Sequence, residues 1–394
     1  MAEDLLPSPH PLTPPRSEED WVFWFRLLRS RRVGPTTFHR LLAEHGNARD
    51  ALRALPEVAR AAGVEEYTPC PAAVAESELK NGRVCGARPV AIGSAEYPPR
   101  LAQLADAPPI LWALGDPALL ARPVVALVGA RNASSLGTRM ARQLAQGLTE
   151  AGYAVVSGLA RGVDTAAHLA SLEGGTIAVM AGGVDVIYPA ENAVLAQEIA
   201  ERGLRLSEQP IGMQPMARHF PARNRIISGL AQAVVVVEAA AKSGSLITAR
   251  NALDQGREVM AVPGHPFDAR AAGCNMLIRD GAMLVRGAQD VVDAIAGQNH
   301  EVQQAKETAE KQEDVIEQIP PETAGNPDPP QRSLKDAAAL HRQILDRLGP
   351  SPLAEDQLIR DIGLPAGRIT PELVTLELDG KIERRPGGLL SRSD

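Results

Sequence analysis

Apolar residues follow helical spacing near the start of the chain and gather into short continuous runs further on. Between residues 17 and 46 the helical pattern is broken once, by the sequence VGP at 33–35, so we expect two helices joined by a tight turn. Arg29, Arg31 and Arg32 stand beside this turn, and its backbone amides could face a phosphate. Because short helix pairs of this kind are common, a small helical docking domain is favoured over a DNA-contacting hairpin.

Short runs rich in Val and Ala follow a proline-rich crossing segment at 97–116, with helical patterns between most of them. The runs cover residues 123–130, 154–160, 176–183, 233–239 and 258–264. Continuous apolar runs suit strands that are buried on both faces of a parallel sheet. The pattern therefore predicts an α/β protein whose core is a Rossmann-like parallel sheet.

The two ends of the chain differ from this core. Residues 1–16 are rich in proline, and residues 298–333 are acidic and rich in Gln and Pro, so we expect a disordered lead-in and a flexible linker. Three helical patterns and a Gly-turned hairpin then predict a C-terminal winged helix. The expected organisation is a lead-in at 1–16, a helix-hairpin-helix-like domain at 17–82, a Rossmann-like domain at 83–297, a linker at 298–333 and a winged helix at 334–394.

Composition narrows the possible partners. The chain is 44% hydrophobic and 23% charged, which is ordinary for a soluble globular protein, and its net charge of −7 gives no global attraction to DNA. Any site for a polyanion must therefore be local. Cys70, Cys85 and Cys274 are isolated thiols, so we expect neither disulfides nor a metal site. No long uncharged apolar stretch occurs, and we expect a cytoplasmic protein without membrane insertion.

Loops that leave the carboxyl ends of parallel strands bind the ligands of such sheets, and four of these loops are rich in Gly, Ser and Arg. Small residues allow close backbone approach to a phosphate, Arg supplies paired donors, and Ser can cap the next helix. The candidate phosphate-binding residues are Gly129, Arg131 and Ser134 in the first loop, Gly158 and Arg161 in the second, Arg223, Asn224 and Arg225 in the third, and Lys242, Ser243 and Gly244 in the fourth.

Several details of these loops limit the chemistry. Neither GxGxxG nor GxxxxGK[ST] occurs, which disfavours ordinary NAD binding and ATP hydrolysis. Asp164 and His168 share a helix face, but no third ligand is in view, so structural hydrogen bonding is favoured over a metal or acid-base role. Phe220 adjoins the arginines and could stack on a base, although core packing is favoured. We expect an anionic ligand and no cofactor; a nucleotide, a sugar phosphate or a nucleic-acid backbone would all fit.

The order of these blocks resembles the DNA-processing protein A family (DprA, also called Smf) over about residues 97–295. The resemblance rests on VGARNASSLG, SGLARGVDTAAH, TIAVMAGGVDVIYPAEN, SEQPIG, FPARNRIISGL, VVVVEAAAKSGSLITARNAL, and AVPG followed by GCNMLIRDGA. It implies a homodimer that binds single-stranded DNA and loads the recombinase RecA during natural transformation, with no catalysis of its own. It also implies that the loop residues named above grip DNA. One departure is Ala130-Arg131-Asn132-Ala133, where relatives more often have Thr or Ser before the Arg.

Two other functions compete with this one. Related Rossmann-like enzymes hydrolyse nucleoside monophosphates with a PGGxGT block and a catalytic Glu, but the nearest string here, MAGGVDVIYP, lacks the Thr, and Glu238 precedes an Arg- and Ser-rich grip. A nucleotide-sensing transcriptional regulator would need a basic recognition helix, whereas the presumed recognition segment at 366–379 is acidic. For the winged helix, protein contact or regulation is therefore favoured over operator binding, with Arg384 and Arg385 supporting the alternative.

Overall fold

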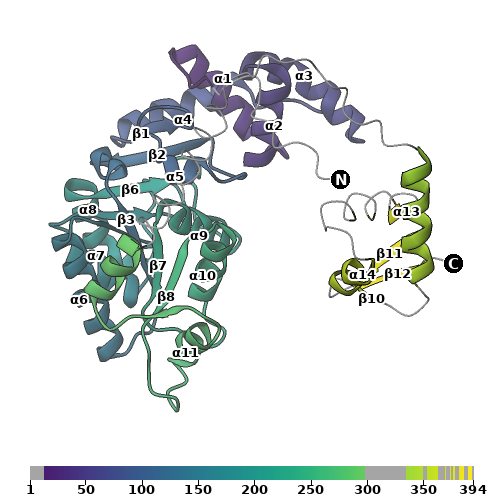
Figure 1. Ribbon diagram of the computed structural model, residues 1–394. Coiled ribbons are helices and arrows are strands. Elements are labelled where there is room, and N and C mark those ends of the chain that lie inside the picture. The colour runs from purple at the N-terminus through teal and green to yellow at the C-terminus, as the bar shows by residue number, and fades with distance from the viewer. Residues whose placement is uncertain are drawn as a thin grey trace, which may run out of the picture. The chain divides into compact units, whose positions relative to one another are not determined.

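The computed structural model describes residues 13–297, 334–348, 353–362, 369, 373, 376, 377, 381–385 and 389–392. The chain forms two compact units, Met1–Ala309 and Glu310–Asp394, which are considered separately (Figure 1). The expected lead-in lies almost wholly outside the described residues, and the expected linker lies entirely outside them.

A nine-stranded sheet forms the centre of the first unit, in the order β1-β2-β6-β5-β4-β3-β7-β8-β9. Strands β3 to β9 are parallel to one another, whereas β1 pairs with β2 and β2 pairs with β6 in antiparallel register. The strands are β1 Arg88–Ala91, β2 Ile110–Gly115, β3 Val124–Val128, β4 Ala154–Ser157, β5 Thr176–Val179, β6 Leu204–Ser207, β7 Ala233–Val236, β8 Glu258–Ala261 and β9 Met283–Leu284.

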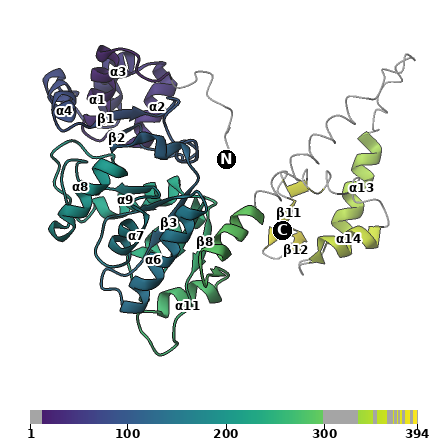
Figure 2. The ribbon, with the colours of Figure 1, turned by 90° about the vertical axis from the view of Figure 1, so that its left-hand side faces the viewer.

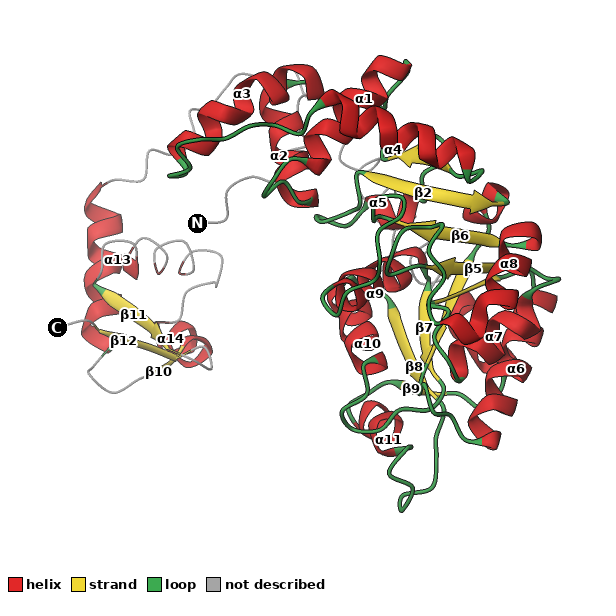
Figure 3. Cartoon of the chain, turned by 180° about the vertical axis from the view of Figure 1, so that it is seen from behind, coloured by secondary structure: helices red, strands yellow, loops and turns green. Residues whose placement is uncertain are grey.

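Helices cover both faces of this sheet (Figure 3). They are α5 Pro99–Ala102, α6 Ser135–Glu150, α7 Val163–Ser171, α8 Ala193–Arg202, α9 His219–Leu230, α10 Ser245–Asp254, α11 Ala272–Arg279 and a helix at 288–297. Successive residues of a strand point to opposite faces. Accordingly, Val125 and Leu127 of β3 pack with α6 and α7, whereas Ala126 and Val128 pack in the cluster that contains α9 and α10.

The N-terminal helices lie along the antiparallel edge of the sheet, next to β1 and β2 (Figure 2). They are α1 Glu18–Arg29, α2 Pro35–His45, α3 Ala48–Ala61 and α4 Ala72–Val84. The predicted helix pair is present as α1 and α2, and the Ser17 side chain caps α1 by accepting a bond from the Asp20 amide. Residues 33–36 in its turn line a cavity together with Pro109 and Glu208 of the core. The preference for a docking domain over a DNA-contacting hairpin stays a prediction.

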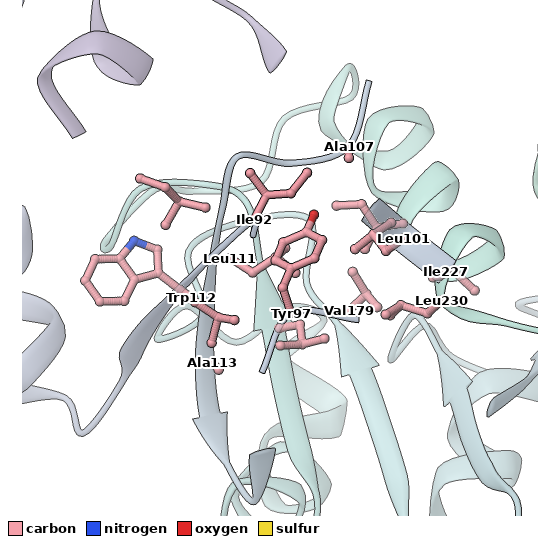
Figure 4. Close-up of a cluster of buried hydrophobic side chains, with 14 of the residues drawn as sticks. Ile92, Tyr97, Leu101, Ala107, Leu111, Trp112, Ala113, Val179, Ile227 and Leu230 are labelled. Carbon is pink, nitrogen blue, oxygen red and sulfur yellow. The ribbon is translucent and has the colours of Figure 1, made fainter. Parts of the chain in front are cut away.

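One continuous core joins the helices to the sheet. Trp112 of β2 is 1% exposed, and its indole stacks 5.3 Å from the Phe25 ring of α1 and donates to Glu78 of α4. Glu78 also forms a salt bridge of 2.7 Å with Arg29. Figure 4 shows Trp112 beside the buried cluster around Tyr97 that continues toward α9. The helices are thus anchored by both apolar burial and a buried polar network.

Sequence patterns predicted the runs that became β3, β4, β5, β7 and β8, all parallel. The antiparallel strands β1 and β2 and the strand β6 were not predicted, so the sheet is mixed rather than purely parallel. The segment at 97–116 is more than a crossing, because it contains α5 and ends in β2. Among the described residues no helix is long and apolar enough to cross a membrane.

The described part of the second unit contains two of the three helices expected of the winged helix, together with its strands. These are α13 Leu334–Arg347, α14 Glu355–Ile362 and a three-stranded sheet of β10 Leu353–Ala354, β11 Ile382–Arg385 and β12 Leu389–Arg392. Buried Ile344, Leu358, Leu373 and Leu390 belong to its core. Most of the presumed recognition segment at 366–379, and the side chains of Arg384 and Arg385, lie outside the described residues.

Candidate functional site

The strand order changes direction at β3. The chain runs from β3 to β4, β5 and β6 on one side, and then returns to place β7 and β8 on the other. In open α/β sheets, ligands bind in the crevice at such a switch point, outside the carboxyl ends of the strands. Here the loops that follow β3 and β7 leave the sheet next to each other.

A cavity of about 600 Å³ lies at this point. Its walls come from the β3–α6 loop, the β4–α7 loop with the start of α7, the start of α9, the β7–α10 loop with the start of α10, and the β8–α11 loop. Of the predicted residues it brings together Gly129, Arg131, Phe220, Arg223, Asn224, Lys242, Ser243 and Gly244. Ser134, Gly158, Arg161 and Arg225 are not among its lining residues. The cavity has roughly the size of a small-ligand site.

Two exposed basic side chains and an aromatic ring line the cavity. The side chains of Arg131 and Lys242 are exposed, and neither forms a salt bridge within the described part of the chain. The Arg131 guanidinium lies over the Phe220 ring, 5.3 Å from its centroid. The expectation that Phe220 packs in the core is wrong, because the residue is only half-buried and its ring edge meets exposed Tyr188 at 5.8 Å.

The β7–α10 loop presents hydroxyl groups and backbone at the start of α10. Ser243 Oγ and Ser245 Oγ are hydrogen-bonded at 2.8 Å. Gly244, the N-cap residue of α10, is exposed, and a Cβ built on it would meet nothing within 4 Å. Packing within the chain therefore does not require glycine at this position, although a ligand close to the backbone would favour one.

Arg223 lines the cavity, but its guanidinium forms hydrogen bonds in the protein interior. It is 6% exposed and donates from Nη1 to the carbonyls of Gly158 at 2.5 Å and Val179 at 2.8 Å. Burial lowers its pKa to about 10, with the nearby Asp164 carboxylate acting in the opposite direction, so it stays charged at neutral pH. A Cβ on Gly158 would lie 1.9 Å from Arg223 Nη1. Glycine at 158 thus makes room for this guanidinium.

Asp164 and His168 have structural roles, as favoured from the sequence. Asp164 Oδ2 accepts bonds from the amides of Gly158 and Ala160, and burial raises its pKa. His168 is fully buried; its Nδ1 lies 2.7 Å from Thr176 Oγ1 and its Nε2 accepts from the Leu159 amide. Burial lowers the pKa of His168 to about 3. Among the described residues no cluster of three or more metal-ligating side chains occurs.

Arg225 and Arg161 lie away from the cavity. Arg225, with a side chain 14% exposed, pairs with Glu208 at 2.5 Å and Asp106 at 3.2 Å. The expectation that Arg223 and Arg225 bind one phosphate together is therefore wrong. The Arg223 guanidinium is buried, and the Arg225 guanidinium is paired with two carboxylates on a different side of α9. Exposed Arg161 lies 3.7 Å from Glu191.

The N-terminus of α6 is occupied by a carboxylate of the chain itself. Glu238, 9% exposed, accepts from the Ser134 amide at 3.0 Å and from Ser134 Oγ at 2.5 Å, while Ser134 Oγ also caps α6. Ser134 therefore has no free hydrogen-bonding role toward a phosphate in this arrangement. Glu238 does not line the cavity, whereas Asp164 does; the Asp164 carboxylate accepts hydrogen bonds from the amides of Gly158 and Ala160.

One cavity residue was missed by sequence reasoning. Arg270 comes from the β8–α11 loop, is exposed, and pairs with Asp268 at 3.1 Å. The β8–α11 loop follows the predicted strand at 258–264. The rule that ligand-binding loops follow the carboxyl ends of parallel strands therefore also applies to Arg270.

The fold and cavity define a Rossmann-like α/β protein with an open site at its switch point. The chain belongs to the DNA recombination-mediator protein A family, whose model matches residues 88–296. A DprA-like N-terminal HHH domain matches residues 18–81, and a DprA winged helix domain matches residues 328–388. The protein is thus a DNA-processing protein of the recombination-mediator class.

Individual relatives agree with this assignment. The chain is 48% identical over 198 residues to DNA processing protein DprA of Streptococcus pneumoniae, covering 50% of this chain and 70% of the relative. It is 36% identical over 308 residues to protein Smf of Synechocystis, covering 74% and 77%. The solved structure of the S. pneumoniae protein has a TM-score of 0.53 at 36% identity, covering 66% of this chain and 98% of the other. DNA processing protein A from Helicobacter pylori, whose structure was described for its single-stranded DNA binding mode, gives 0.50 at 31%, covering 54% and 97%.

Proposed function

We propose that the cavity at the switch point binds single-stranded DNA through its phosphates, as the DNA-binding step of a recombination mediator. The observation that carries this proposal is the convergence of Arg131, Lys242 and Arg270, from three separate loops, on one cavity at the carboxyl ends of β3, β7 and β8. In a chain with a net charge of −7, such a local group of cations favours a polyanion over a neutral ligand.

The residue types at the cavity favour backbone binding over base reading. Arg and Lys side chains and backbone amides contact phosphates and carry no base code. Lys242 is exposed and forms no salt bridge with any residue that the structure describes, and the Arg131 guanidinium lies over Phe220. That ring, half-exposed at the cavity wall, can stack on an unpaired base of any sequence. A duplex keeps its bases stacked internally, so the aromatic contact favours single strands.

Gly244 gives a separate argument for close backbone approach. Open space around its Cα at the start of a ten-residue helix suits a phosphate that contacts the first-turn amides. Gly244→Ala should leave the stability unchanged and weaken DNA binding. Gly287→Ala is a matched control, because a Cβ there also meets nothing within 4 Å and the residue does not line the cavity.

The cellular location, the oligomeric state and the role with RecA are proposed from membership of the family. We infer a cytoplasmic homodimer that loads RecA onto incoming DNA during natural transformation and does not itself break bonds. The H. pylori relative, described for binding single-stranded DNA, supports the ligand. Two linked cavities would raise the affinity for a long strand.

The proposal is tested by equilibrium binding of labelled single-stranded and double-stranded oligonucleotides of several sequences, with hydrolysis of nucleoside monophosphates assayed on the same preparation. We expect tight binding of every single strand, weaker binding of duplexes and no hydrolysis. Preference for duplexes, or hydrolysis with negligible strand binding, would overturn the proposal.

A further inference from the structure

The loop between β8 and α11 projects an aromatic side chain into solvent. Phe267 is 94% exposed, more than any other large hydrophobic residue in the described parts of the chain. Single exposed apolar residues are ordinary on protein surfaces, so exposure alone assigns no role. Two further features distinguish Phe267: the hydrogen bonds that hold its loop, and the contribution of the same loop to the cavity.

Internal hydrogen bonds fix the conformation of this loop. The Asn275 side chain holds Gly264, the first residue of the loop, through two hydrogen bonds. It donates to the Gly264 carbonyl at 3.0 Å and accepts from the Gly264 amide at 3.1 Å. The amides of Phe267 and Asp268 donate to His265 Nδ1 and to the His265 carbonyl. The His265 and Phe267 rings lie 5.6 Å apart. The aromatic ring is thus held outward by a structured loop.

The same loop contributes to the cavity. Arg270, which lines the cavity, follows Phe267 by three residues, so their Cα atoms are at most about 11 Å apart. Asp268 holds the Arg270 guanidinium through bonds of 3.1 and 3.2 Å. A strand whose phosphate reaches Arg270 therefore passes close to the exposed ring. Cationic tracks with interspersed aromatic rings are typical of proteins that bind single strands without sequence preference.

We propose that Phe267 is a second base-stacking position, which extends the single-stranded DNA track from the cavity over the β8–α11 loop. This inference rests on the proposed function and adds to it a contact outside the cavity. Phe220 at the cavity wall is the first stacking position. Phe267, braced by His265, receives a base from a neighbouring nucleotide, and Arg270 holds the phosphate between the two.

The test compares the wild-type protein with Phe267→Ala on two oligonucleotides of about 20 nucleotides, one of deoxythymidine and one with abasic sites throughout. Loss of base stacking should weaken binding of the first oligonucleotide by at least roughly five-fold and leave binding of the abasic strand unchanged. Phe267→Trp should bind the deoxythymidine strand at least as well as the wild type. Val194→Ala is the control, because Val194 is 75% exposed on α8 and does not line the cavity.

Each outcome discriminates. Equal binding of deoxythymidine strands by the wild type and Phe267→Ala would overturn the stacking role while leaving the proposed function intact. Equal weakening on both strands, or a change of oligomeric mass by sedimentation in Phe267→Ala, would assign the ring to a protein contact and also overturn the inference. Failure of the wild type to bind either strand would instead overturn the proposed function itself.

Discussion

Replacing Arg223 with Met separates the structural arginine from the ligand-facing one. The wild-type guanidinium satisfies two buried carbonyls and faces the Asp164 carboxylate, which is 6% exposed. Arg223→Met removes both of these hydrogen bonds and also the positive charge that opposes the rise in the pKa of Asp164. Each buried acceptor left unsatisfied costs about 1–3 kcal/mol, so the two together cost a large fraction of the stability of a typical domain.

The assay is thermal and urea unfolding of Arg223→Met beside Arg131→Gln. We expect a fall in Tm of roughly 10 °C for Arg223→Met. For Arg131→Gln, whose side chain is exposed, we expect a change within about 0.5 kcal/mol. Adding Asp164→Asn to Arg223→Met should restore part of the lost stability, because it removes the uncompensated charge.

The reasoning would be refuted if Arg223→Met were as stable as the wild type and lost DNA binding in the same way as Arg131→Gln. That result would place the Arg223 guanidinium on the ligand and not in the core. An unchanged or lower stability in the double variant would show that Asp164 does not depend on this counter-ion.

Further predictions concern burial and docking. Burial lowers the pKa of His168 from 6.5 to about 3, so the unfolded chain takes up a proton on this histidine at a higher pH than the folded chain does. The free energy of unfolding is therefore unaffected by His168 above about pH 6.5 and falls by about 1.4 kcal/mol per pH unit as the pH decreases toward 3. Equal pH slopes of unfolding free energy for the wild type and His168→Gln between pH 7 and 5 would contradict this. Gly158→Ala should lower stability by about 1–3 kcal/mol, since its Cβ would meet the Arg223 guanidinium; an unchanged Tm would argue against it. Glu78→Ala leaves the largely buried Arg29 unpaired and should cost about 2 kcal/mol or more, with α1–α4 becoming the first segment cut in limited proteolysis; a wild-type digestion pattern would oppose this.

Sequence patterns predicted the parallel strands because those strands are buried on both faces and therefore consist of continuous apolar residues. Strand β6, LRLS, alternates and carries Arg205, a pattern that suggests a half-exposed strand, yet Arg205 is only 5% exposed. Strand β2 follows directly after Pro108 and Pro109, which read as loop. Tertiary burial thus overrode the local pattern at both strands.

The rule that loops gather at the carboxyl edge of a parallel sheet predicted that the candidate residues lie together, and eight of the twelve line one cavity. Residues 223–225, predicted in a loop, belong instead to helix α9. The rule could not tell which guanidinium groups remain free. The partners of Arg223 are the Gly158 and Val179 carbonyls, and that of Arg225 is Glu208. All three are distant in sequence and meet these arginines only in the folded chain. Likewise, nothing adjacent to Ser134 indicates that Glu238 occupies the helix N-terminus in front of it.

The central claim, that cations at the cavity contact DNA phosphates, is tested most directly by the salt dependence of single-strand binding. The slope of log K against log salt should become shallower by about 0.7 for each phosphate contact removed, in Arg131→Gln and in Lys242→Gln separately. Arg53→Gln, a substitution of an exposed arginine on α3 outside the cavity, should keep the wild-type slope. If both cavity variants also retained that slope, the phosphates would not be bound at this cavity.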